Sequence, residues 1–389
     1  MIATILTPRL IVIGGGAIAQ VADTLKQIGG RSPLIVTDKF MVSSGKIRLL
    51  SDLLDAAGVR WDVFSETVED PTDTVIAAGV ARLQQGGYDS LIALGGGSPI
   101  DSAKAMAVLA ANGGKMRDYK VPNAIPKTGL PLIAIPTTAG TGSEVTRFTV
   151  ITDVETDEKM LIAGVACLPA AAIVDYELTL SKPLRLTADT GIDSLTHAIE
   201  SYVSKRASPY TDALALSAMR LIAANIRTVC TDPGNRPARE AMMLAATQAG
   251  MAFSNASVAL VHGMSRPIGA HFHVPHGLSN AMLLPAVTAF SASAALTRYA
   301  DCARRMGVAD DGVGDEEAVG RLLAELRKIN ADLGVPSPKR YGIGEKEYFA
   351  LIPRMAEQAL ASGSPNNNPR VPTHAEITRL YEEVWASEP

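Results

Sequence analysis

The chain has 389 residues, of which 47% are apolar and 20% charged, so it has the composition of a globular protein that is too long for one core. Its net charge of −4 argues against nucleic acid or an anionic membrane surface as the main partner. The cysteines, Cys167, Cys230 and Cys302, form no C-x-x-C motif, which excludes a disulfide framework and a thiolate metal site.

The N-terminal segment is apolar but lacks the basic region and the cleavage site of a signal peptide. On inspection, no apolar run is long enough to span a bilayer. We therefore expect a cytoplasmic protein that has no membrane partner.

Up to about residue 180, short β-branched runs alternate with helical patterns. Strands are predicted at 34–37, 61–64, 90–94, 132–135 and 172–174, and helices at 43–57, 73–85 and 98–111. Apolar strands separated by helices indicate a parallel sheet covered on both faces, a Rossmann-like α/β fold. The segments 148–151 and 160–163 flank a polar turn and predict an added hairpin.

After residue 180 the pattern becomes helical. Helices are predicted at 187–204, 208–228, 236–256, 292–306, 315–334, 345–361 and 374–386. Pro183 marks the boundary, because proline cannot continue a strand ladder or a helix interior. We expect an α/β domain at 1–182 and an all-α domain at 183–389.

Three glycine or hydroxyl clusters in the first half are suited to a phosphate. Gly14, Gly16 and Ala19 match G-x-G-x-x-A, although a tight turn explains this motif equally well. The run 95–98 (GGGS) is stronger, because it follows a buried strand and opens a helix whose N-terminus attracts an anion. In that first turn, Asp101 either stabilises the helix dipole or contacts a cofactor.

The third cluster, IPTTAGTGSE at 135–144, follows the next strand. Its hydroxyl groups lie at the carboxyl end of a strand, where open α/β sheets bind ligands. They belong to Thr137, Thr138, Thr141 and Ser143. Two such loops on consecutive strands predict a dinucleotide site. Asp38 ends the strand 34–37 and favours NAD over NADP if it accepts from a ribose, or else caps a turn.

Residues able to hold a divalent metal gather in the second half, where five of the six histidines fall between residues 197 and 276. Asp193 and His197 lie four apart on a predicted helix, and His262 and His276 each precede a glycine. One carboxylate and three imidazoles suit Fe²⁺ or Zn²⁺ better than Mg²⁺ or Ca²⁺. Such a metal would act as a Lewis acid on an alcohol during hydride transfer to a nicotinamide, although a structural metal or core histidines remain alternatives.

Together these motifs resemble the iron-containing (group III) alcohol dehydrogenase family. The resemblance rests on IVTDK at 35–39, GGGSPIDSAK at 95–104, IPTTAGTGSEVT at 135–146, LTADTGIDSLTHAIESYVS at 186–204, AGMAFSNA at 249–256, LVHGM at 260–264, VPHGLSNAMLLP at 274–285 and NPR at 368–370. It implies an NAD-binding N-terminal domain, a helical metal-binding domain and a homodimer or larger homo-oligomer. It also implies that Gly14–Gly16 is only a turn.

The resemblance implies a role for individual residues. The implied metal ligands are Asp193, His197, His262 and His276. The implied NAD contacts are Asp38, Gly96, Gly97, Ser98, Thr137, Thr138, Thr141, Ser143, Lys159 and Leu178, to which we add Asp101 from its place in the helix turn. The implied substrate-pocket positions are Phe148 and Phe253, for which core packing is an equal account.

One position departs from the family pattern. Four residues after His262, the family usually has a further histidine near the substrate, and this chain has Arg266. Arginine cannot shuttle a proton at neutral pH, and His271 or His273 would have to replace that function. Arg266 suits either a substrate with an anionic group or an ion pair with a neighbouring acid.

We therefore expect an NAD-dependent, Fe²⁺- or Zn²⁺-dependent alcohol dehydrogenase or aldehyde reductase acting on a small alcohol or aldehyde. One alternative is a lyase resembling 3-dehydroquinate synthase, which uses NAD transiently, but the apolar run 249–262 argues against its basic pocket. Another is a non-catalytic oligomeric protein with vestigial sites.

Overall fold

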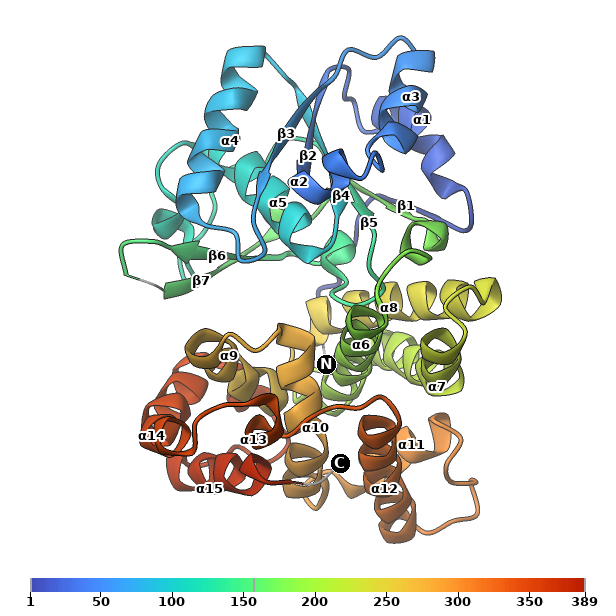
Figure 1. Cartoon of the computed structure of the whole chain (residues 1–389), viewed down its shortest axis with the longest axis vertical. Helices are drawn as coiled ribbons and strands as arrows, with labels where there is room; N and C mark the ends of the chain where they lie inside the picture. The colour runs from blue at the N-terminus through green and yellow to red at the C-terminus, as the bar shows by residue number, and fades with distance from the viewer. Residues whose placement is uncertain (1, 157, 388–389) are drawn as a thin grey trace. The chain divides into compact units, whose positions relative to one another are not determined.

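The computed structural model describes residues 2–156 and 158–387, and the chain divides into two compact units, a first unit of residues 5–180 and a second unit of residues 181–387 together with residues 2–4. The first unit contains a six-stranded sheet in the order β1-β8-β5-β4-β2-β3, with every pairing parallel (Figure 1). Its strands are β1 (Leu10–Ile13), β2 (Pro33–Asp38), β3 (Asp62–Thr67), β4 (Ser90–Gly95), β5 (Leu132–Pro136) and β8 (Ala171–Val174).

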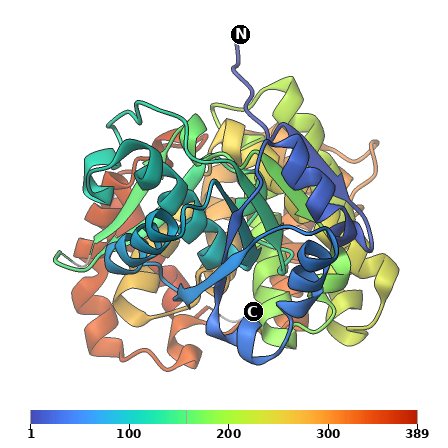
Figure 2. The ribbon, with the colours of Figure 1, turned by 90° about the horizontal axis from the view of Figure 1, so that it is seen from above.

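Helices cover both faces of this sheet, as predicted. They are α1 (Val21–Gln27), α2 (Lys39–Ser43), α3 (Arg48–Ala56), α4 (Asp73–Gly86) and α5 (Gly97–Asn112), with short 3₁₀ turns η1 (Ala17–Gln20), η2 (Met116–Tyr119), η3 (Ser143–Val145), η4 (Val165–Cys167) and η5 (Tyr176–Thr179). Alternate strand residues pack on opposite faces, so Leu34 and Val36 join one core with α4 and α5, and Ile35 joins another with α1 and α3. Figure 2 shows helices on both sides of the sheet. Strand β1 was not predicted; it is a run of only four apolar residues between Arg9 and Gly14.

The order of the strands creates a switch point between β2 and β4. From β2 the chain adds β3 on one side, and from β4 it adds β5 on the other side. Ligands of open parallel sheets bind at the carboxyl ends of the strands beside such a point. The predicted hairpin is present as β6 (Phe148–Asp153) and β7 (Glu158–Ala163), which pair antiparallel.

The second unit is helical, as predicted. It consists of α6 (Leu184–Val203), α7 (Pro209–Thr231), α8 (Arg236–Ala256), α9 (Leu260–Phe272), α10 (His276–Ala292), α11 (Leu296–Arg305), α12 (Asp315–Asp332), α13 (Pro338–Tyr341), α14 (Glu345–Ala361), α15 (His374–Trp385) and the 3₁₀ turn η6 (Ser364–Asn367). Helices α9 and α10 were not predicted; each contains an internal proline, Pro267 or Pro285, as does the predicted helix α14 at Pro353. Tertiary packing offsets the hydrogen bond that each proline removes.

Helix α7 requires a correction to the expectation about apolar runs. By length and composition alone it could cross a membrane, and the bent pair α8 and α9 also passes that test. However, Ala215, Met219 and Ile222 of α7 are buried, and its Arg227 pairs with Glu325 and Asp332. One face of α7 therefore packs inside the unit.

Candidate metal and cofactor sites

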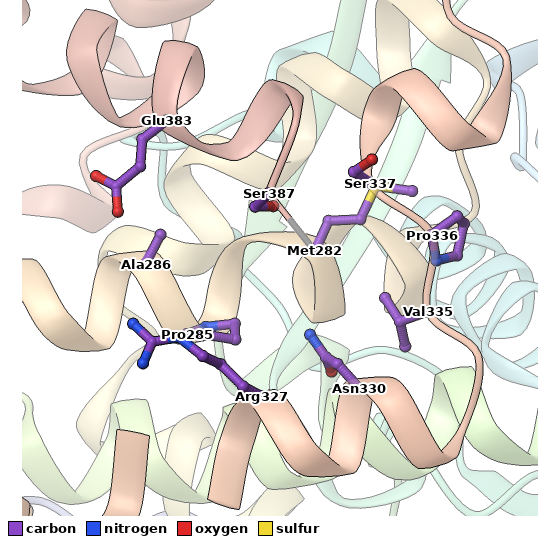
Figure 3. Close-up of a pocket in the computed structure, with 10 residues that line it drawn as sticks. All are labelled: Met282, Pro285, Ala286, Arg327, Asn330, Val335, Pro336, Ser337, Glu383 and Ser387. Atoms are coloured by element: carbon purple, nitrogen blue, oxygen red, sulfur yellow. The ribbon is translucent and has the colours of Figure 1, made fainter. Parts of the chain in front are cut away.

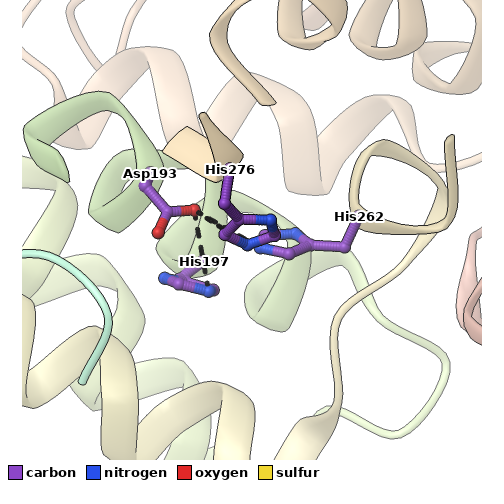
Figure 4. A group of neighbouring side chains, drawn as sticks. All are labelled: Asp193, His197, His262 and His276. Atoms are coloured by element: carbon purple, nitrogen blue, oxygen red, sulfur yellow. Dashed lines mark ion pairs between the residues drawn. The ribbon is translucent and has the colours of Figure 1, made fainter. Parts of the chain in front are cut away.

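Three helices of the second unit bring together the four predicted metal ligands. Asp193 and His197 lie one turn apart on α6, His262 lies in the first turn of α9, and His276 is the first residue of α10. Figure 4 shows their side chains converging, and one ligand atom from each lies within 4.8 Å of the others. We call these four residues the metal cluster.

The spacing of the donor atoms suits a small divalent ion. Asp193 Oδ1 lies 3.8 Å, 3.4 Å and 3.9 Å from the Nε2 atoms of His197, His262 and His276, respectively. A tetrahedral ion bonded at about 2.1 Å separates its ligand atoms by about 3.4 Å. The donor set contains no thiolate and one carboxylate, which fits Fe²⁺ or Zn²⁺.

Asn280, one turn after His276 on α10, adds a second observation that a cation fits here. Its Nδ2 atom lies 2.7 Å from Asp193 Oδ1, 3.1 Å from His262 Nε2 and 3.3 Å from His276 Nε2. An amide nitrogen has two hydrogens and cannot donate fully to three acceptors. The metal cluster therefore directs more lone pairs to one point than the neutral amide of Asn280 can satisfy, whereas a divalent cation at that point would bind all of them.

Glu200, a further residue of α6, orients His262. Its Oε2 lies 2.6 Å from His262 Nδ1, and its Oε1 accepts the Val261 backbone N–H at 2.6 Å. When Nδ1 carries the proton and donates it to Glu200, the Nε2 lone pair faces the metal cluster. Such an outer carboxylate is typical of imidazoles that bind metals.

The cluster is charged and mostly buried. The side chains of Asp193, His197 and His262 are 2%, 4% and 3% exposed, whereas that of His276 is 49% exposed, so one side of the cluster is accessible. Burial opposes the charge on His262, but hydrogen bonds to Asp193 and Glu200 outweigh it and raise its pKa to about 9. Burial likewise opposes the charge on Asp193, but the three imidazoles hold its pKa below its usual value.

Phe253, predicted to line the substrate pocket, packs directly on the cluster. Its ring stacks on that of His197 with centroids 4.1 Å apart and an interplanar angle of 14°. On the other side, the ring of His197 stacks on that of His262 at 4.5 Å. Phe253 therefore fixes the orientation of a metal ligand.

The two histidines considered as replacements for the missing one lie at the C-terminal end of α9. His271 is nine residues after His262 on α9, about 13 Å along the axis, and on the opposite face. Its Nε2 contacts Gln358 Oε1 of α14 at 2.8 Å. His273 is exposed and ends α9 in the left-handed conformation. Among the described residues, neither contacts a residue of the metal cluster, and a role for one of them in place of the missing histidine stays a prediction.

The predicted cofactor residues lie at the carboxyl ends of neighbouring strands in the first unit. Asp38 ends β2, the glycine run follows β4, and Thr137 follows β5, and these three strands are adjacent. Asp38 Oδ1 also accepts the Met41 N–H at 2.8 Å and so caps α2. A Cβ atom on Gly97 would lie 3.0 Å from Thr141 Cγ2, so glycine permits the two loops to approach.

Within these loops, some predicted contacts have internal partners. Lys104 is fully buried and donates to Ser143 Oγ, Thr146 Oγ1 and the Phe148 carbonyl. Ser143 Oγ donates to Asp101 Oδ1 at 2.6 Å. By contrast, the buried Thr137 hydroxyl has no hydrogen-bond partner among the described residues, as expected for a group that contacts a ligand.

The other predicted cofactor residues also have partners within the first unit. Ser98 Oγ donates to the Glu69 carbonyl, and the Lys159 ammonium pairs with the Asp70 carboxylate at 2.9 Å. Thr141 Oγ1 accepts from the Ser143 N–H, Thr138 lies near Gly96, and Leu178 packs against the core that includes α1 and α3. The turn at Gly14–Gly16 has another partner, because the Gly16 and Ile18 N–H groups donate to the Asp175 carboxylate. That cluster is a capped turn.

A separate pocket lies beside α10 in the second unit (Figure 3). Its lining residues on α10 are Met282, Pro285 and Ala286, with Arg327 and Glu383 among the others. None of the residues that line it belongs to the metal cluster, and Pro285 lies on the face of α10 opposite His276. The pocket is therefore distinct from the metal cluster.

Two family models cover most of the chain. One, described as iron-containing alcohol dehydrogenase, matches residues 8–176, and the other, the C-terminal part of the Fe-containing alcohol dehydrogenase family, matches residues 187–385. The chain belongs to the iron-containing alcohol dehydrogenase family. The predicted family and fold class are thus confirmed.

Named members of the iron-containing alcohol dehydrogenase family are similar over their full length. The chain is 39% identical to the NAD-dependent methanol dehydrogenase of Bacillus methanolicus, covering 97% of this chain and 98% of that one. It is also 39% identical to the lactaldehyde reductase of Escherichia coli (strain K12), covering 96% and 97%. A crystal structure of 1,3-propanediol oxidoreductase matches with a TM-score of 0.95 at 36% identity, covering 99% and 100%.

Sequence reasoning missed two residues that act on the metal cluster. Glu200 is seven residues after Asp193, two turns along the same face of α6, so its spacing was a usable signal. Asn280 is four residues after His276, but α10 was not predicted, so this spacing could not be interpreted.

Proposed function

We propose that this member of the family is an NAD-dependent, metal-dependent alcohol dehydrogenase or aldehyde reductase. The metal cluster carries the proposal, because three imidazoles and a carboxylate converge with one side accessible. The similarity to relatives named as NAD-dependent methanol dehydrogenase and lactaldehyde reductase supports the reaction type. A family match over both units favours this function over a lyase, and a complete donor set favours it over a vestigial site.

The first unit, proposed as the NAD-binding domain at 1–182, would hold the dinucleotide at the β2/β4 switch point. The N-terminus of α5 and the backbone N–H groups of Gly96 to Ser98 would bind the phosphates. Asp38 would accept from the adenosine ribose, and its charge would repel a 2′-phosphate. Thr137, Thr138 and Thr141 would donate from the next loop. Asp101 and Ser143 would support the cofactor without contacting it, because their hydrogen bond with each other and that of Ser143 with Lys104 hold this loop in place.

The second unit, proposed as the metal-binding domain at 183–389, would supply the catalytic polar groups. Asp193, His197, His262 and His276 would hold Fe²⁺ or Zn²⁺, which when bound lowers the pKa of an alcohol and polarises an aldehyde carbonyl. Glu200 keeps the His262 proton on Nδ1, and Phe253 keeps the His197 ring in place. NAD supplies the hydride chemistry.

We further propose a cytoplasmic homodimer or larger homo-oligomer, which the family resemblance and the exposed apolar side chains Phe40 and Leu49 support. Light scattering after size-exclusion chromatography would measure the assembly.

Activity is tested with purified protein loaded anaerobically with Fe²⁺ or Zn²⁺. We expect NADH oxidation with a short aldehyde and NAD reduction with the matching alcohol, both lost in His262→Ala. An Arg321→Ala variant, which changes only an exposed helix pair with Glu317, is the control. Metal binding without turnover across a panel of short aldehydes would contradict the proposal.

A further inference from the structure

Arg266 is a cation of the second unit that lacks a carboxylate partner. It lies one turn after His262 on α9, so the two side chains project from the same face. Among the described residues, its guanidinium makes a single hydrogen bond, from Nη1 to Ser364 Oγ at 3.2 Å, and no ion pair. This excludes the ion pair considered from the sequence.

The carboxylate of Glu200, whose charge acts on Arg266, already accepts hydrogen bonds from other groups. Glu200 attracts Arg266 electrostatically, but both of its oxygens accept short hydrogen bonds from Val261 and His262. Burial lowers the pKa of Arg266, although its side chain is only half-buried and the charge of Glu200 partly raises the pKa. An anion bound beside the guanidinium would stabilise its charge.

Ser364 supplies a second donor at the same place. Its oxygen accepts from Arg266, and no described residue accepts its hydroxyl hydrogen, which is therefore available to a further acceptor. The position of Ser364 is fixed because η6 packs on α9 at Gly263, where a Cβ atom would lie 2.8 Å from Pro365 Cγ. The Asn367 side chain also anchors η6 by donating to the Val258 carbonyl.

We propose that Arg266 and Ser364 form a carboxylate subsite, and that the preferred substrate is a short aldehyde or alcohol with a carboxylate at its far end. A planar guanidinium can donate two parallel N–H···O bonds to the two oxygens of a carboxylate, and this pair of bonds would fix the orientation of the substrate. Four residues of helix separate Arg266 from His262, about 6 Å along the axis, which a four-carbon semialdehyde spans. This inference rests on the proposed function for the reaction at the other end of the substrate.

The test compares two four-carbon aldehydes, succinic semialdehyde and n-butanal, which differ in the carboxylate. For each variant, the ratio of kcat/KM for the anionic substrate to kcat/KM for the neutral one is measured. In Arg266→Gln this ratio should fall about 10- to 100-fold, mainly through KM of the anionic substrate. Arg266→Lys should retain part of the ratio, because it keeps the charge without the planar pair of donors. Ser364→Ala should lower the ratio less.

Arg239 provides a matched control. It is likewise an arginine of the second unit without an ion pair among the described residues, it is more buried than Arg266, and its guanidinium donates to the Pro233 carbonyl and the Thr187 hydroxyl. Arg239→Gln should disturb folding at least as much as Arg266→Gln does, yet leave the ratio unchanged. A ratio that falls equally in both variants would show a general effect of losing a buried arginine and would overturn the subsite.

A binding measurement separates this inference from the proposed function. Calorimetric titration with butyrate needs no turnover, and it should show binding to the wild-type protein that is at least tenfold weaker in Arg266→Gln. If the wild type reduces neither aldehyde, the proposed function fails and the butyrate titration alone decides on the subsite. If the ratio is unchanged in Arg266→Gln, or if butyrate binds both proteins equally, the subsite is refuted.

Discussion

Replacing Glu200 by glutamine tests whether a buried carboxylate prepares His262 for metal binding. The carboxylate accepts two hydrogen bonds of 2.6 Å, from the Val261 backbone N–H and from His262 Nδ1. Glutamine has nearly the same shape but only one accepting oxygen. Val261 N–H cannot change its role, so the amide oxygen should keep that bond and turn its NH₂ group toward His262.

The expected consequence is a change of tautomer. His262 Nδ1 then accepts from the glutamine, its proton moves to Nε2, and Nε2–H points into the metal cluster, where a lone pair is needed. Loss of an outer carboxylate of this kind typically lowers metal affinity 10- to 100-fold, which corresponds to about 1.4 to 2.8 kcal/mol. We expect Glu200→Gln to fall in that range for Zn²⁺.

The assay is a Zn²⁺ titration against a competing chromophoric chelator. Asp301→Asn is the control, because Asp301 accepts from Tyr202 of the same helix, α6, but touches no residue of the metal cluster. Both variants should lose stability, and only Glu200→Gln should lose metal affinity. A Zn²⁺ affinity within twofold of the wild type in Glu200→Gln would refute this account of His262.

Three further predictions concern the cofactor and the stability of the two units. Asp38→Asn keeps the cap on α2 but removes the charge, so the preference for NAD over NADP should fall about tenfold, as measured by the ratio of kcat/KM values. Lys104→Met leaves three acceptors and Asp101 without a cation, and should lower the free energy of unfolding in urea by about 3 kcal/mol. Chelation should abolish activity. It should also lower the free energy of unfolding by about 2.7 kcal/mol relative to protein in a free metal concentration of about 100 times the dissociation constant.

Each of these has a specific contrary outcome. An unchanged cofactor preference in Asp38→Asn would mean that this residue only caps its helix. Wild-type stability in Lys104→Met would mean that apolar packing replaces the buried network. Full activity after exhaustive chelation would remove the metal from the reaction.

The fold was predictable where the sequence pattern is local. The central strands are continuous apolar runs bounded by glycine or proline, and β4 and β5 appear within one residue of their predicted limits. Helix α10 was not predictable in this way, because it is apolar on all sides and shows no periodic stripe. Its existence depends on burial against other helices, which a local pattern does not contain.

The metal cluster was predictable because its chemistry requires unusual residue types. Histidines are few in this chain, and the i,i+4 spacing of Asp193 and His197 is recognisable from the sequence alone. The residues that support the cluster are common types whose role depends on distant contacts. Ser364 reaches Arg266 across 98 residues, and nothing in the sequence around either one indicates the contact.

Arg266 shows how the two kinds of information combine. The family pattern singled it out, but both an ion pair and a substrate contact could explain an arginine at that position. The contacts argue against the ion pair. Glu200 is the carboxylate whose charge acts on Arg266, and it already accepts hydrogen bonds from Val261 and His262. A half-buried guanidinium with no ion pair among the described residues, one turn from a predicted metal ligand, is free to pair with an anion. The arrangement therefore favours the substrate contact that we propose, and the ratio of the two kcat/KM values tests it.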